Sequence, residues 1–175
     1  MLTAAIERTM IVNSNIVCYD EIRKLVPPAV SPRMGFEKER TTMALPAIPD
    51  THRDLLENNQ VAILATVGPD GSPQVTASWF LAEEDGTVKM SLNTTRQKVK
   101  NLMRRPESSL FFMDPANPYR TLEIRARAEI EPDPDYVFAD QVGAKYGGAD
   151  VRTMDQPGET RVAITFVPVK INTFG

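Results

Sequence analysis

The sequence predicts a mainly β fold of the α+β class, an antiparallel β-barrel with two or three short helices. Three observations predict it. Short apolar or alternating segments recur from residue 60 to the end of the chain, glycine- and proline-containing turns separate them, and the helical patterns between them are short. Six or more antiparallel strands favour a barrel, because closing a sheet on itself removes its exposed edges. An open sheet with one covered face is the alternative.

The chain is predicted to have one folded domain behind a proline-rich segment. Five prolines lie within residues 26–50, and closely spaced prolines resist regular structure. We therefore predict an N-terminal extension or linker over residues 1–50 and a barrel domain over residues 51–175. The alternative is that residues 4–12 or 20–26 form a small helix docked on that domain.

Composition and charge indicate an ordinary globular protein. The chain of 175 residues is 42% hydrophobic and 25% charged, with a net charge of -3 and a pI near 5.3. A nucleic-acid binder of this size would be basic, so any anion site must be a local patch. The single cysteine, the lack of a long apolar stretch and the lack of a signal-peptide pattern lead us to expect a cytoplasmic protein with no membrane partner.

The domain should begin with a helix from Thr51 to Asn58, with Leu55 and Leu56 buried, and continue as a meander. Its three strands are predicted at residues 60–67, 72–84 and 88–93, with turns at 68–71 and 85–86. The middle strand alternates, with Val75, Ala77, Trp79 and Leu81 on one face and Gln74, Thr76 and Ser78 on the other.

A central helix follows, from Thr94 to just before Pro106. Thr94 and Gln97 have the spacing of a capping box, which supports this start. The core-facing side should consist of Val99, Leu102 and Met103.

Four further strands and one helix complete the predicted domain. Residues 120–131 alternate most clearly, with apolar side chains facing in and charged ones facing out. Gly147 and Gly148 should end the last helix. The elements are a strand at 108–114, the strand at 120–131, a helix at 136–146 and a final pair of strands at 161–167 and 169–174.

The start of the central helix carries positive charge where anions are favoured. Arg96 and Lys98 lie in or near the first turn, where the macrodipole disfavours each cation by about 0.3–1 kcal/mol. A phosphate bound there, close to the free amides and threonine hydroxyls, would remove this conflict. Lys100 and Arg104 extend the positive strip. A solvated helix face is the alternative, whereas a nucleic-acid groove is disfavoured because no aromatic residues are interleaved.

Other catalytic and metal patterns are lacking. The glycine motifs of dinucleotide-binding and P-loop folds do not occur, and His52 is the only histidine, so we expect neither a serine triad nor a zinc or iron site. Tyr119 and Tyr146, near loop or helix ends, are candidate proton donors. No catalytic residue is assigned from the sequence.

The segments ATVGPDGSPQV, RQKVKNLMRRP and LEIRARAEI followed by EPDPD occur in the order and spacing of the pyridoxamine 5'-phosphate oxidase-like (PPOX class) superfamily of flavin and deazaflavin proteins. The C-terminal VAITFVPVKINTFG resembles the last strands of that family. The resemblance covers the chain from about residue 54. It implies a split β-barrel of the FMN-binding type and a homodimer with cofactors at the interface.

The resemblance also implies which residues bind the cofactor. The basic segment of the family holds the cofactor phosphate, which corresponds here to Arg96, Lys98 and, less directly, Lys100. The second strand runs along the ring system and the following segment along the linker, which correspond to Gln74, Val75, Thr76 and Ser78, and to Ser91, Thr94 and Thr95.

The details resemble members that use the deazaflavin coenzyme F-420. The RQKVKNL segment and the TFG ending are closer to these members, while the C-terminal tryptophan and arginine-rich signature of true pyridoxamine phosphate oxidases is missing. The implied function is hydride transfer between coenzyme F-420 and an unsaturated or conjugated small molecule. An FMN-dependent oxidoreductase or FMN-binding protein is the first alternative. A non-catalytic cofactor carrier or sensor is the second, and an interaction module built on the basic helix is a third.

Overall fold

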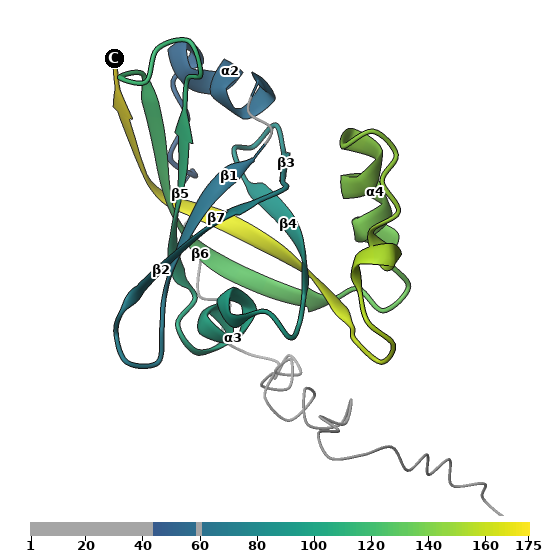
Figure 1. Cartoon of the computed structure of the whole chain (residues 1–175). Helices are drawn as coiled ribbons and strands as arrows, with labels where there is room; N and C mark the ends of the chain where they lie inside the picture. The colour runs from purple at the N-terminus through teal and green to yellow at the C-terminus, as the bar shows by residue number, and fades with distance from the viewer. Residues whose placement is uncertain (1–43, 59–60) are drawn as a thin grey trace, which may run out of the picture. The chain divides into compact units, whose positions relative to one another are not determined.

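One antiparallel sheet of seven strands organises the part of the chain that the computed structural model describes, residues 44–58 and 61–175. The strand order is β2-β1-β5-β6-β7-β4-β3. The two edge strands, β2 (Pro73–Ser78) and β3 (Leu81–Ala82), are consecutive in the chain, and only Trp79 and Phe80 connect them. The sheet therefore has to curl until its edges approach each other, as Figure 1 shows. This confirms the predicted antiparallel barrel in its split form.

The strands and helices follow the predicted order. The other strands are β1 (Ala62–Val67), β4 (Val88–Asn93), β5 (Glu107–Met113), β6 (Thr121–Pro132) and β7 (Arg161–Phe174). The helices are α2 (Asp50–Asn58), α3 (Gln97–Arg104), α4 (Val137–Lys145) and the short 3-10 helix η1 (Val151–Met154). Helices α2 and α3 lie at opposite ends of the curled sheet (Figure 1). Of the helices in the described ranges, none has the length and hydropathy needed to cross a membrane.

The predicted extension or linker over residues 1–50 lies outside the described residues as far as residue 43, as do the alternative helices at 4–12 and 20–26. Among its last residues, Ile48 is buried and belongs to the hydrophobic core.

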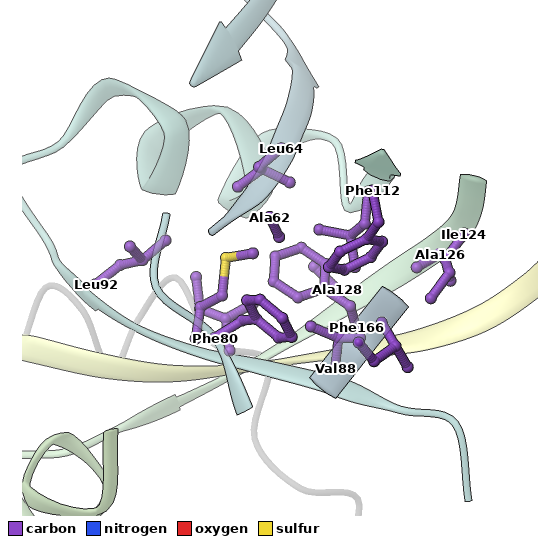
Figure 2. Close-up of a cluster of buried hydrophobic side chains, with 14 of the residues drawn as sticks. Ala62, Leu64, Phe80, Val88, Leu92, Phe112, Ile124, Ala126, Ala128 and Phe166 are labelled. Carbon is purple, nitrogen blue, oxygen red and sulfur yellow. The ribbon is translucent and has the colours of Figure 1, made fainter. Parts of the chain in front are cut away.

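The core lies on the concave face of the sheet. The predicted alternation on β6 is confirmed, because Leu122, Ile124 and Ala126 point inward. Phe80, from the link between the two edges, packs edge-to-face on Phe112 with ring centroids 5.1 Å apart, and Figure 2 shows both rings inside the cluster. Full burial of one such side chain contributes about 1.5–3 kcal/mol, so Phe80 holds the link in place.

Three predicted strands differ from the structure. The strand predicted over residues 72–84 is interrupted at Trp79 and Phe80, where the chain crosses from one edge of the sheet to the other. The strands predicted at 161–167 and 169–174 are one strand, β7. Pro168 lies at a register shift between β6 and β7, and such a bulge accommodates the missing amide of proline.

The ends of α4 are fixed by local chemistry. Asp133 accepts hydrogen bonds from the amides of Phe138 and Ala139 at 3.2 and 2.9 Å, which caps the first turn. At the other end Gly147 and Gly148 both have a φ of 76°, which confirms them as the predicted stop. The carbonyl of Gly143 accepts bonds from three amides of the following turn.

We predict that Gly143→Ala destabilises the protein. A Cβ at this position would lie 2.1 Å from the carbonyl oxygen of Ala149, so the turn after α4 would have to shift. The free energy of unfolding in urea should fall by about 1–3 kcal/mol. The exposed neighbour Ala144→Ser serves as the control and should stay within about 0.5 kcal/mol of the wild type. Equal stability of Gly143→Ala and wild type would contradict the close approach.

Candidate anion-binding site at the split of the sheet

Helix α3 begins at Gln97, so the predicted capping box at Thr94 is wrong. The amide and hydroxyl of Thr94 instead donate to the carbonyl oxygen of Thr160 at 2.9 and 3.1 Å. The Gln97 side chain donates to Asn101 at 2.8 Å rather than reaching back. Arg96 is the N-cap, with an extended backbone and no capping hydrogen bond from its side chain. The first amides of α3 are therefore left without a side-chain acceptor.

Of the predicted cations, Lys98 is the one that reaches back to the edge strand β2, at the open side of the curled sheet that we call the split. It is half-buried in the first turn of α3, and its Nζ donates to the Oγ of Ser78 at the end of β2. In the part of the chain that the structure describes, no carboxylate forms an ion pair with this ammonium. Burial lowers the pKa of Lys98, and the positive charge of Arg96 lowers it further. A half-buried cation without a counterion is stabilised when an anion binds to it.

The inner face of β2 is polar. Gln74, Thr76 and Ser78 point toward the inside of the sheet, whereas Val75 is 61% exposed on the outer face. Gln74 accepts a hydrogen bond from Asn101 at 2.9 Å, and Ser78 accepts one from Lys98. We call these three residues (Gln74, Thr76 and Ser78) the β2 polar row. They reverse the usual pattern, in which the face of a strand toward the interior is apolar.

Asn101 anchors α3 to this row and is a residue that the sequence analysis missed. It is only 1% exposed, and its amide group donates to Thr66 at 3.1 Å and to Gln74 at 2.9 Å. Met103, predicted to face the core, is 45% exposed. Hydrophobic periodicity cannot detect a buried amide, and the pairing of Gln97 with Asn101 one turn later is the only hint in the sequence.

Three predicted site residues lie in a different cluster, at the end of β4. Ser91 Oγ accepts from Arg161 at 3.3 Å. The hydroxyl of Thr95 donates to Asn93 at 2.7 Å, and Thr94 is bound to Thr160 as described above. Ser91, Thr94 and Thr95 therefore already have protein partners.

A buried ion pair forms the centre of this second cluster. Arg161 and Asp155 are 8% and 4% exposed at their side chains, and they are joined by hydrogen bonds of 2.6 and 3.0 Å. Asn93 and Tyr136 also donate to Asp155, at 2.8 and 3.1 Å. Burial opposes ionisation of Asp155, but the hydrogen bonds from Arg161 and Asn93 outweigh it and hold the pKa of Asp155 below its usual 3.8. Sequence periodicity gave no signal for this pair, because its members lie in a loop and at a strand end.

The remaining predicted residues lie around the two clusters. Arg96 and Lys100 are exposed on α3. The ring of Tyr146 stacks on Trp79 at 4.6 Å, and its hydroxyl accepts from the amide of Phe80 and donates to its carbonyl. Tyr119 is an exposed surface residue.

The histidine also has partners within the fold. His52 is buried, and its ring contacts Thr51 Oγ1 at 2.9 Å and the carbonyl oxygen of Phe174 at 3.3 Å. In the described ranges no group of three or more histidine, cysteine or acidic side chains is arranged to hold a metal ion.

Comparison with known proteins gives a family-level match. The family model described as pyridoxamine 5'-phosphate oxidase matches residues 48–173. The structure of an F420 reductase is 35% identical, with a TM-score of 0.63, over 71% of this chain and 98% of the other. No curated protein matches the sequence.

More distant structures share the fold. A conserved hypothetical protein from Mycobacterium tuberculosis is 24% identical, with a TM-score of 0.60, over 75% of this chain and 87% of the other. HutZ, a heme storage protein from Vibrio cholerae, is 19% identical, with a TM-score of 0.57, over 71% of this chain and 93% of the other. At these identities the likeness concerns the fold alone.

We predict that Asp155→Ala is strongly destabilising, because it leaves the Arg161 guanidinium buried and unpaired. The free energy of unfolding should fall by about 3–5 kcal/mol. Since the folded-state pKa of Asp155 lies below the unfolded value of 3.8, the stability from its ionised form is present above pH 3.8 and is lost as the pH falls below it.

Urea unfolding of wild type, Asp155→Ala and the milder Asp155→Asn across this acidic range provides the measurement. The wild type should lose stability on acidification more steeply than either variant. The exposed Asp135→Asn in the loop before α4 is the matched control and should keep the wild-type slope. If all four proteins followed the same pH dependence, Asp155 would not be the titrating group.

Proposed function

Because the chain belongs to the pyridoxamine 5'-phosphate oxidase family, we propose that the split of its sheet holds a phosphorylated cofactor of the flavin type and that the protein is an oxidoreductase. The observation that carries the proposal is Lys98, a half-buried ammonium that has a serine hydroxyl as its partner and, among the described residues, no carboxylate. Its position at the start of α3 adds unpaired backbone amides, which favour a phosphate.

We propose that two side chains and the N-terminal end of α3 contact the phosphate. Lys98 would bind the phosphate directly, and the exposed Arg96 at the N-cap can turn toward it. Lys100 is exposed and further along α3, so its contribution would be long-range. The β2 polar row would face the part of the cofactor beyond the phosphate, with Val75 on the opposite side of the strand.

Coenzyme F-420 is the cofactor we propose, with FMN as the alternative. The similarity to an F420 reductase at 35% identity supports this choice, as do the RQKVKNL segment and the TFG ending. The reaction would be hydride transfer between the deazaflavin and an unsaturated or conjugated small molecule, chemistry that the cofactor supplies when bound. The protein would position the cofactor and the substrate.

The two candidate tyrosines do not present a free proton donor. The hydroxyl of Tyr146 is bound to both backbone groups of Phe80, and Tyr119 lies on the surface. We therefore propose solvent as the proton source. Heme is disfavoured as the resident group, because the chain has one histidine and its ring is already bound within the fold.

A second copy of the chain is the partner we propose. The outer faces of β2, β1 and β5 carry adjacent apolar side chains, since Ile63 pairs with Ala77 on one side and Phe111 on the other. Val75 and Phe111 are 61% and 38% exposed in the single chain. A contiguous apolar sheet face of this kind is typical of homodimer interfaces, which would also complete a cofactor site that opens at the edge of the sheet.

We predict that Lys98→Met weakens cofactor binding while Lys100→Met, on the exposed side of the same helix, changes it little. Loss of a charge-assisted contact corresponds to about 10–100-fold in the dissociation constant. The free energy of unfolding without ligand should not decrease, because burial lowers the pKa of Lys98 and its charged form opposes folding at neutral pH. Parallel titrations with coenzyme F-420 and FMN, followed by fluorescence, measure both variants and wild type.

The same titrations separate the alternatives. Tighter binding of coenzyme F-420 supports the proposed cofactor, and tighter binding of FMN supports the FMN protein. A bound cofactor without reduction of any compound in a panel of conjugated electrophiles supports the carrier or sensor. Wild-type affinity in Lys98→Met would refute the phosphate assignment, and binding of neither cofactor would refute the proposed function.

We predict that Phe111→Lys converts a dimer into a monomer. A lysine there would place a charge in the centre of the proposed apolar interface, and loss of a central contact of this kind raises the dissociation constant by about 30-fold or more. Sedimentation velocity at micromolar concentration is the measurement. Val137→Lys, which changes an exposed valine on α4, is the control and should remain dimeric. A monomeric wild-type protein would refute the proposed partner.

A further inference from the structure

We propose that Lys145 and the indole ring of Trp79 bind the substrate, and that the substrate is a planar conjugated compound with a carboxylate. Lys145 would pair with the carboxylate, and Trp79 would stack on the conjugated part. The inference rests on the proposed function, because it names the substrate class of the same oxidoreductase. It uses residues of α4 and of the link between the edge strands, which no step of the proposed cofactor binding employs.

The ammonium of Lys145 has no counterion within residues 44–58 and 61–175. Its Nζ donates to the carbonyl oxygen of Phe80 at 3.1 Å, and no carboxylate in these ranges forms an ion pair with it. An ammonium has three N–H donors, so two remain for another acceptor. Partial burial lowers the pKa of Lys145, and no charged group among the described residues contributes to this shift. A cation partly withdrawn from water attracts an anion more strongly than one in bulk water.

The ammonium is held in place by aromatic rings. Its Nζ lies 3.9 Å from the ring centroid of Phe80 and 5.5 Å from that of Tyr146, and a cation over a ring face is attracted by the ring quadrupole. Lysine in the last turn of a helix commonly compensates the macrodipole, but this Nζ donates to Phe80 and not to a carbonyl of α4. Lys145 is therefore fixed against the link, although the residue as a whole is exposed.

Trp79 adds a stacking surface to this cation site. The ring of Tyr146 covers one face of the indole, with ring centroids 4.6 Å apart and an interplanar angle of 6°. Trp79 as a whole is only half-buried, so part of its side chain is open to a ligand. Planar conjugated groups stack on aromatic rings in the same offset or parallel arrangements. A positive charge beside a partly open indole suits a flat molecule with an anionic group.

This site adjoins the proposed cofactor site. Lys98 of α3 donates to Ser78, whereas Lys145 of α4 donates to Phe80. Only Trp79 separates these two acceptor residues, whose Cα atoms are therefore at most about 7 Å apart. The two ammoniums thus approach the link from two different helices. One suits the phosphate of the cofactor, and the other suits the carboxylate of a substrate bound next to it.

Trp79 provides the readout, because it is the only tryptophan in the chain. The probes are trans-cinnamate and its neutral amide, added to the full chain saturated with coenzyme F-420 or FMN, whichever it binds. Wild type should show saturable quenching and bind the acid about tenfold more tightly than the amide, the value of a charge-assisted contact. Lys145→Met and Lys145→Gln should lose this preference, and Lys145→Arg should keep it. Lys170→Met removes an exposed lysine of β7 and is the matched control that should behave as wild type.

Three results would overturn the inference and leave the proposed function intact. They are equal binding of acid and amide by wild type, a preference for the acid that survives in both Lys145→Met and Lys145→Gln, and weaker binding of coenzyme F-420 or FMN in these variants. The last would assign the cation to the cofactor. The same additions to N-acetyltryptophanamide measure collisional quenching and absorbance. Failure of the wild type to bind either cofactor would refute the proposed function, and the substrate assignment with it.

Discussion

The two-residue link between the edge strands is the constraint on which the rest of the structure depends. Because Trp79 and Phe80 alone connect β2 to β3, the seven-stranded sheet that these edges bound must curl until the edges nearly meet. Phe80 secures the link by filling the core against Phe112, and Tyr146 satisfies both of its backbone groups. Beside this link, at the end of β2, Lys98 of α3 reaches back to the hydroxyl of Ser78.

Charge compensation distinguishes the two polar clusters of the molecule. The buried guanidinium of Arg161 is paired with Asp155, and the neighbouring side chains bind one another, so the cluster holds the loop before β7 against the end of β4. At the split, the ammonium of Lys98 and the hydroxyl of Thr76 are both left short of partners. A cluster complete in itself stabilises the fold, whereas an incomplete one is the kind of site that a ligand can complete.

The architecture could be predicted from the sequence because strand periodicity and turn residues are local signals. The alternation on β6 and the glycine stop of α4 agree with the structure. The capping box failed because Thr94 found a partner 66 residues away in Thr160, and no local pattern encodes such a contact. For the same reason Asn101 was missed, and the interruption at Trp79 could not be read from an alternation that continues through it.

Strand β2 departs from the usual pattern of polar and apolar residues on both of its faces. Its inner residues are polar although they face the interior, and its outer residue Val75 is apolar although it faces solvent. A strand that had only to support the core would have the opposite arrangement. This arrangement is the one expected if a polar ligand covers the inner face and an apolar protein surface covers the outer face, as proposed above. Since both faces belong to six residues at the edge of one sheet, occupancy of the inner face and cover of the outer face would stabilise the same strand.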